Sequence, residues 1–167
     1  MTNKILSCFV CCALFFFACG VSNSKPGTAN SYPGFQLYYS YAGLGSNMGG
    51  MYPVFRVTGN NYTYTNEQNS YYGKPDKKPE FVCSGQLRNS SIDSILQLAG
   101  QVPDTLVYST TPGVLSGGIH HISINYNQKK LTYTLHNAYD SVAAKIVHIL
   151  NTNIPDGKNR LWLFTAN

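Results

Sequence analysis

The most constraining feature of this sequence is an alternation of apolar and polar side chains that two neighbouring segments between Ile119 and His136 share. If Asn127-Gln128 forms a turn, the two halves pair as antiparallel strands in one consistent register. One face then carries His120, Ile122, Ile124, Tyr126, Leu131, Tyr133 and Leu135. The other face carries His121, Ser123, Asn125, Lys130, Thr132, Thr134 and His136. The pattern predicts a hairpin with one buried face, although Asn-Gln is a weak turn signal and a longer loop with the same register stays open.

An amphipathic helix is predicted directly after this hairpin. Asp140 is expected to cap its N-terminus by accepting hydrogen bonds from free N–H groups of the first turn. Its apolar stripe consists of Val142, Ile146, Ile149 and Leu150, with Val147 on the flank. Pro155 and Gly157 are expected to end the helix. A strand–strand–helix unit of this kind buries the helix stripe against the apolar face of the hairpin.

The rest of the chain predicts further strands and one more helix. Strand patterns cover residues 35–41, 52–58, 62–65, 81–87, 106–108 and 161–164. Ser90 and Asp93 have the spacing of a capping box, and a helix carrying Ile92, Ile95, Leu96 and Ala99 on one face follows. The predicted fold class is α+β, with a mainly antiparallel sheet of about eight strands and two amphipathic helices packed on it.

The N-terminus has the pattern of an export signal. Lys4 supplies a positive charge, and an apolar run of 14 residues from Ile5 to Ala18 follows it. A helix that spans a bilayer needs about 20 apolar residues, so this run is too short to be one. Ala18-Cys19-Gly20 resembles the lipobox of bacterial lipoproteins, in which the cysteine is acylated and becomes the first residue of the mature chain. We expect a lipid anchor at Cys19, with an ordinary cleaved signal as the alternative.

This anchor defines the predicted domain organisation. Residues 1–18 are the signal peptide, residues 19–33 a flexible tether rich in Ser, Asn, Gly and Pro, and residues 34–167 a single domain. Several acyl chains on one residue exceed the single chain that gives only marginal membrane binding. We therefore predict a protein of the bacterial cell envelope, held through Cys19 on a membrane that we take to be the outer one.

Cysteine and charge content exclude other classes. Cys8, Cys11 and Cys12 would leave with the signal, and Cys83 would remain beside the acylated Cys19, so no internal disulfide is expected. Twelve lysines and arginines face seven acidic residues, and the basic residues are scattered along the chain. Nucleic-acid binding needs a clustered basic surface, so no nucleic-acid partner is predicted.

The four histidines lie between His120 and His148 and invite a metal or acid–base hypothesis. His121 and His136 lie diagonally on one face of the predicted hairpin, but two imidazoles make an incomplete metal site. His120 falls on the buried face, where we expect it to be hydrogen-bonded. A structural role is therefore favoured for the histidines over a metal site.

Three other motifs also favour structural roles. The glycine-rich loop Gly43–Gly50 precedes a strand, whereas a phosphate-binding loop needs a helix directly after it. Gly113–Gly117 differs from a nucleophile elbow because its serine is displaced by one residue. Cys83 lies in a predicted strand, where a buried inert thiol is favoured over a nucleophile. The sequence thus predicts no catalytic residue, no metal ligand and no cofactor.

Tyrosine is abundant, with 13 in the chain. Its ring offers broad apolar contact with a polar tip, which suits binding surfaces. About half of the tyrosines must be buried if they lie in alternating strands. Tyr71 and Tyr72 lie in a predicted exposed loop, so they are the candidates for contact with a protein or glycan partner.

Several segments together resemble known proteins. A strand, Gly49-Gly50, paired strands and a Ser-initiated helix precede "GGIHHISI", "LTYTLHNA" and a closing helix. This order resembles small lipoproteins of the bacterial envelope and, more distantly, is similar to emfourin, a protein inhibitor of thermolysin-like metalloproteases. The function we expect is that of a membrane-tethered, non-enzymatic binding or structural lipoprotein. Inhibition of an extracytoplasmic protease is the alternative, and a hydrolase is the third hypothesis.

Overall fold

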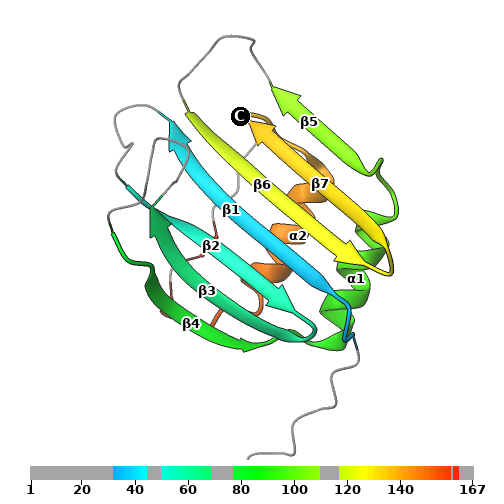
Figure 1. The fold of residues 1–167 in the computed structure, drawn as a ribbon, viewed down its shortest axis with the longest axis horizontal. Coiled ribbons are helices and arrows are strands. Elements are labelled where there is room, and N and C mark those ends of the chain that lie inside the picture. Colours follow the sequence, from blue (N-terminus) through cyan, green and yellow to red (C-terminus); the bar gives the residue numbers. More distant parts are fainter. Residues whose placement is uncertain (1–31, 45–49, 69–76, 110–116, 159, 162–167) are drawn as a thin grey trace, which may run out of the picture.

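In the computed structural model, the alternating stretch forms two of seven strands in a single sheet (Figure 1). The structure describes residues 32–44, 50–68, 77–109, 117–158 and 160–161. The strands are β1 (Gln36–Leu44), β2 (Met51–Thr58), β3 (Asn61–Gln68), β4 (Glu80–Gln86), β5 (Thr105–Ser109), β6 (Gly117–Tyr126) and β7 (Lys129–His136). The helices are α1 (Asn89–Ala99) and α2 (Ser141–Asn151).

The strand order across the sheet is β4-β3-β2-β1-β6-β7-β5. The first six strands in this order pair antiparallel with their neighbours, and β5 joins the edge parallel to β7. The α+β class and the mainly antiparallel sheet are therefore as predicted. The described residues form seven strands and not about eight, because Leu161 is not in a strand and residues 162–164 lie outside the described part.

The β6–β7 hairpin has the register that the alternation predicts. Ile124 pairs with Leu131 and Ile122 with Tyr133, and all four side chains are buried. Asn127 and Gln128 have φ angles of 49° and 68°, so both turn residues adopt the left-handed conformation. This is the geometry of a type I′ turn, whose twist matches that of the two strands. The two-residue turn is thus confirmed despite its weak sequence signal.

The buried face of the sheet continues from this hairpin into β1 and β2. Leu37 of β1 pairs with Ile124 of β6 on one side and with Val57 of β2 on the other. Together these strands form the floor of one hydrophobic core, and its largest fully buried side chains are Tyr39, Tyr64, Tyr133, Phe35 and Phe55. Both helices cover this floor, and Figure 1 looks onto the opposite face with α1 and α2 behind the strands.

Helix α2 begins where predicted but is rotated about its axis from the predicted stripe. The Asp140 carboxylate accepts hydrogen bonds from the backbone N–H groups of Val142 at 3.0 Å and Ala143 at 2.8 Å. The fully buried residues of the helix are Ala143, Ile146, Val147 and Leu150, whereas Val142 and Ile149 are half-buried. The small Ala143 faces the sheet because it lets the helix backbone approach closely, a criterion that apolarity alone does not capture.

The capping box predicted for helix α1 is wrong. The helix starts at Asn89 with Arg88 in the N-cap position, and no side chain caps it. Ser90 therefore lies inside the first turn, and its carbonyl accepts a hydrogen bond from the Ser94 hydroxyl. Asp93 does not reach back to the helix start; instead, it accepts a 2.5 Å hydrogen bond from the hydroxyl of Tyr32. The Asp93 carboxylate, which a capping box would use at the helix start, is thus bound to a residue far away in the sequence.

The chain after α2 folds back and is hydrogen-bonded to the end of that helix. The Asn151 side chain donates to the Leu161 carbonyl at 3.0 Å and accepts from the Leu161 N–H at 2.7 Å. Leu161 is buried in the same core as the helices. In the part of the chain that is described, neither helix has the length and apolar character to cross a membrane.

The register of β6 gives a sharp stability test. Ile124 is only 3% exposed, so Ile124→Ala should lower the free energy of unfolding by about 2–5 kcal/mol through lost burial and a residual cavity. The neighbouring Ser123 lies on the opposite face, so Ser123→Ala should change it by about 0.5 kcal/mol or less. Denaturant melts of both variants measure this difference. Equal costs would contradict the register, because a shift by one residue exchanges the two faces.

Candidate binding site on the uncovered face of the sheet

Among the described residues, no helix covers the face of the sheet opposite α1 and α2 (Figure 1). Polar side chains on this face form rows that run across the strands. In one row, Tyr38 of β1 lies between Arg56 of β2 and Ser123 of β6. In the next row, Gln36 lies between Thr58 and Asn125. The rows continue into β7, where Ser123 pairs with Thr132 and Asn125 with Lys130. Adjacent strands are about 4.8 Å apart, so each row presents polar groups at a regular spacing.

A shallow groove of about 390 Å³ lies over these rows. The side chains of the two rows that line it are Gln36, Tyr38, Arg56, Thr58, Ser123, Asn125 and Lys130. They offer amide and hydroxyl groups that both donate and accept hydrogen bonds, and two cations that only donate. We call this surface the uncovered-face groove. Its chemistry suits a polar ligand that carries hydrogen-bonding groups and negative charge.

Arg56 is held in place at one end of the groove. Its guanidinium forms a two-pronged ion pair with the Glu67 carboxylate, with N···O distances of 2.5 and 2.8 Å. It also donates to the Thr65 hydroxyl at 3.3 Å and lies 5.4 Å from the centre of the Tyr38 ring. The hydrogen bond from Arg56 lowers the pKa of the Glu67 carboxyl, which therefore stays ionised near neutral pH. A long, flexible side chain is thus fixed on an exposed surface.

His121 lies on the other side of Tyr38 on the same face. The two rings meet edge to face with their centres 6.0 Å apart. The His121 Nδ1 atom is 3.3 Å from the Thr134 hydroxyl. Burial lowers the pKa of His121, and the positive charge of Lys130 lowers it further. His121 is therefore expected to be mostly neutral at pH 7, and the positive charge of Lys130 acts on this face as far as His121.

His136 shares this face with His121, as the sequence predicts, since the register places Thr134 opposite His121 and Ile119 opposite His136. Within the described ranges, no three His, Cys, Asp or Glu side chains come together as a group that could hold a metal ion. The absence of a metal site remains a prediction for the whole chain.

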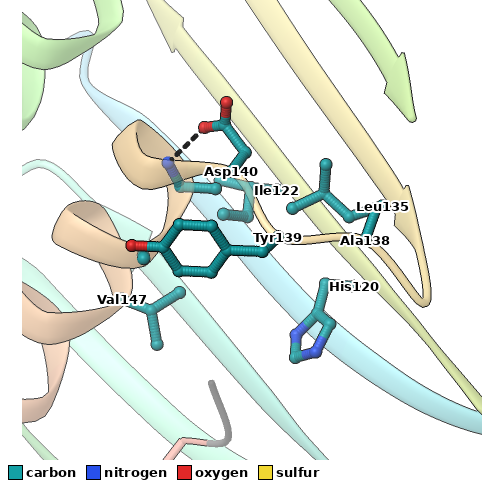
Figure 2. A pocket seen from close by; sticks show the side chains of 9 residues that line it. His120, Ile122, Leu135, Ala138, Tyr139, Asp140 and Val147 are labelled. Atoms are coloured by element: carbon teal, nitrogen blue, oxygen red, sulfur yellow. Dashed lines mark hydrogen bonds between the residues drawn. The ribbon is translucent and has the colours of Figure 1, made fainter. Parts of the chain in front are cut away.

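His120 is buried on the helix side, also as predicted. Figure 2 shows it with Ile122 and Leu135 of the sheet, opposite Val147 of α2, around a cavity of about 20 Å³. Tyr139 lies between the strands and the helix in this view. Such a volume is close to that of a single water probe, and its lining is almost wholly apolar. The cavity is therefore a packing defect beneath the helix and has no room for a substrate.

The His120 imidazole has aromatic neighbours in the core. Its Nδ1 atom is 3.1 Å from the Tyr39 hydroxyl, and the Tyr41 ring centre lies 4.9 Å from its own. The Tyr41 ring in turn lies against the backbone of Gly118, where an added Cβ would come within 2.2 Å of a ring atom. Burial lowers the pKa of His120 to about 4, so the imidazole is neutral at physiological pH.

Several residues singled out from the sequence lie elsewhere. Cys19, Tyr71 and Tyr72 fall outside the described residues, so lipid attachment and the predicted tyrosine contact remain predictions. Cys83 is buried in β4, and burial raises the pKa of its thiol, which suits an inert residue. The Gly43–Gly50 and Gly113–Gly117 loops are mostly outside the described part. Their predicted lack of catalytic function stays a prediction.

Tyr38 and Arg56 were missed by sequence reasoning as candidate binding residues. Tyr38 belongs to the alternating strand after Phe35, and Arg56 is the charged residue among the apolar residues of β2. Alternation alone places each on a solvent-facing side. Their juxtaposition with Ser123 and Lys130 requires β1 to pair with both β2 and β6, which local patterns do not specify.

No protein-family model matches this sequence, and no curated protein is similar to it at a significant level. Function therefore has to be inferred from the chemistry of the described residues.

The buried His120 predicts a pH dependence of stability. An unfolded histidine has a pKa near 6.5, and the folded value is about 4, so the unfolded chain binds the proton first as the pH falls. The contribution of His120 is complete above about pH 6.5 and is lost progressively as the pH falls to 4, at a cost of about 3 kcal/mol in the free energy of unfolding.

Urea melts between pH 4 and 7.5 on the wild type and on His120→Gln measure this contribution. The difference between the two proteins isolates His120 from the carboxylates and from His121, which titrate in both. We expect the variant to have the flatter profile. Parallel profiles would mean that burial of the neutral imidazole does not govern acid stability.

Proposed function

We propose that this protein is a membrane-tethered, non-enzymatic binding protein of the bacterial cell envelope that contacts its partner through the uncovered face of its sheet. The tether and the location rest on the export signal and on Ala18-Cys19-Gly20. The binding role is supported by one observation, namely that Arg56 is fixed beside Tyr38 on an exposed face by a two-pronged ion pair.

This observation matters because ordering an exposed arginine costs side-chain entropy. An ion pair on a protein surface contributes only about 0–1 kcal/mol to stability, so such an arrangement adds little to the fold itself. A binding surface, in contrast, gains affinity when its side chains are ordered before the ligand arrives. The uncovered-face groove combines this ordered cation with a second cation and several amides and hydroxyls. Recognition of a polar partner explains the arrangement better than stability does.

The tether is tested by the variant Cys19→Ala. Without the acylated cysteine, the protein should be released from the membrane fraction or should accumulate as an unprocessed precursor. Fractionation followed by immunoblotting, with metabolic labelling by a radioactive or clickable fatty acid, measures both outcomes. A variant that is matured and sediments with membranes as the wild type does would refute lipid anchoring at Cys19.

The binding face is tested by affinity capture from envelope extract with the full-length protein in detergent. Ser123→Glu places a carboxylate in the middle of the groove, whereas Ser141→Glu makes the same change on the first turn of α2, on the helix side. We expect Ser123→Glu to lose the specific partner and Ser141→Glu to retain it. Circular dichroism melts verify that both variants remain folded.

Equal capture by both variants would refute the uncovered face as the binding surface. A stoichiometric protease in the eluate, inhibited by the wild type, would instead support the alternative of a protease inhibitor.

A further inference from the structure

We propose that the uncovered-face groove binds an acidic polysaccharide, with Arg56 and Lys130 contacting its anionic substituents and the side chains between them contacting its hydroxyl groups. This inference rests on the proposed role of the uncovered face and names the class of ligand that the face binds. The substituents are carboxylate or sulfate groups, which present the same negative charge and acceptor oxygens to an arginine or a lysine.

The charges of the groove select a negative ligand. Among the described residues, its lining contains Arg56 and Lys130 and no acidic side chain. Glu67 pairs with Arg56, whereas no carboxylate of the described residues lies within ion-pair distance of Lys130. The positive charge of Lys130 is also felt by His121, whose pKa it lowers. An anionic group placed between these residues would be attracted by Lys130 and would meet N–H groups of the Arg56 guanidinium that are not bonded to Glu67 or Thr65.

The spacing of Arg56 and Lys130 favours an extended ligand. Arg56 is on β2 and Lys130 is on β7, and β1 and β6 lie between these strands. The two residues are therefore separated by three strand spacings, or roughly 14 Å across the sheet. If both side chains stand upright on their strands, a single phosphate or a free monosaccharide is too small to contact both cations. An extended oligosaccharide that runs across the strands can contact both.

The groups between the cations suit the hydroxyls of sugars. Gln36 and Asn125 are adjacent across β1 and β6 and provide planar amides that both donate and accept. Ser123 and Thr58 add hydroxyl groups at the neighbouring positions. Each sugar hydroxyl is both a donor and an acceptor, so a lining of amides and hydroxyls can satisfy it in either role. Because these residues stand on strands and not on loops, their spacing is fixed by the backbone ladder.

A protein partner fits this groove less well. The centres of protein interfaces combine several large side chains, mainly aromatic residues, Met and Arg, whereas among the described residues Tyr38 is the one aromatic side chain that lines the groove. Among the described residues, the most exposed large apolar side chains are Phe81, Val107 and Tyr139. The first two lie on the edge strands β4 and β5, and Tyr139 precedes α2 on the helix side. None of them lines the groove. A nucleic acid also fits poorly, since it is bound through many phosphate contacts and the groove has two cations.

The test measures binding of the full-length protein in detergent to three polysaccharide probes. Polygalacturonate carries carboxylates, dextran sulfate carries sulfates, and unmodified dextran is neutral. We expect either anionic probe, or both, to bind at least tenfold more tightly than dextran. The difference between polygalacturonate and dextran sulfate identifies the anionic group. Dextran binding with equal affinity would overturn the requirement for negative charge.

The variant Lys130→Ala locates the site. It should weaken binding of the anionic probe about tenfold or more, as expected for the loss of one contact to a charged group. Lys145→Ala is the matched control because it removes one positive charge from the exposed side of α2. It should leave the affinity unchanged. Equal weakening by both variants would show that only net charge matters and would overturn the site.

The His121 imidazole gives a second, independent measurement. Its pKa, followed by NMR, should rise when an oligogalacturonate binds, because a nearby negative charge favours the imidazolium. Lys130→Ala should raise the same pKa without any ligand. A ligand that binds without moving this pKa would bind elsewhere on the molecule. An oligonucleotide that displaces polygalacturonate at equal charge concentration would likewise overturn selectivity for a polysaccharide.

Failure of this inference is distinguishable from failure of the proposed function. If no polysaccharide binds while Ser123→Glu still abolishes capture of an envelope partner, the face is a binding surface for another class of molecule. If polysaccharides do not bind and Ser123→Glu has no effect on capture, the uncovered face is not the binding surface.

Discussion

The pairing of β1 with β6 is the interaction on which the rest of the structure depends. Residues 36–44 of β1 and 117–125 of β6 are paired continuously, from Gln36–Asn125 to Leu44–Gly117. The pairing joins the meander of β1 to β4 to the β6–β7 hairpin and thereby makes one sheet from two halves. It also aligns the two faces, because Leu37 and Tyr39 are paired with Ile124 and Ile122 on the buried side. A shift of the β1–β6 register by one residue would turn the apolar side chains of one half of the sheet toward solvent.

Local chemistry was sufficient to predict the hairpin and the start of α2. The alternation from Ile119 to His136 has one register that keeps both strands consistent, and the carboxylate of Asp140 can cap only the helix that follows it. Patterns of this kind depend on neighbours in the sequence, and here tertiary contacts agree with them. Where tertiary contacts compete, prediction failed. Asp93 binds Tyr32 and not the start of α1, and close approach to the sheet turns Ala143 of α2 inward beside Val147.

The strand order and the parallel addition of β5 could not be predicted from local patterns. A strand of five residues such as β5 carries little register information, and its partner β7 comes more than twenty residues later in the chain. For the same reason, the residues of the uncovered-face groove could be predicted only in part from the sequence. Alternation placed Ser123, Asn125 and Lys130 on one polar face, but their neighbours Tyr38 and Arg56 come from strands that join through the β1–β6 pairing. The polar face was predictable, and its combination of residues was not.

Two consecutive pairs of residues link the core to the groove. Tyr38 and Tyr39 are adjacent on β1, and His120 and His121 are adjacent on β6, so each pair has one side chain on each face. On the buried face, Tyr39 contacts His120 through its hydroxyl, with 3.1 Å between the oxygen and Nδ1. On the uncovered face, Tyr38 meets His121 edge to face, and Arg56 lies over the same tyrosine ring.

The backbone that carries the groove residues is therefore fixed by a contact beneath it that is shielded from water. A substitution at Tyr39 or His120 would shift Tyr38 and His121 and would change the affinity for the proposed ligand without touching that ligand. Substitutions on the uncovered face should have little effect on the core in return, because side chains there can be exchanged without opening a cavity in the core. A sheet of this kind can thus keep a stable core while the chemistry of its exposed rows changes.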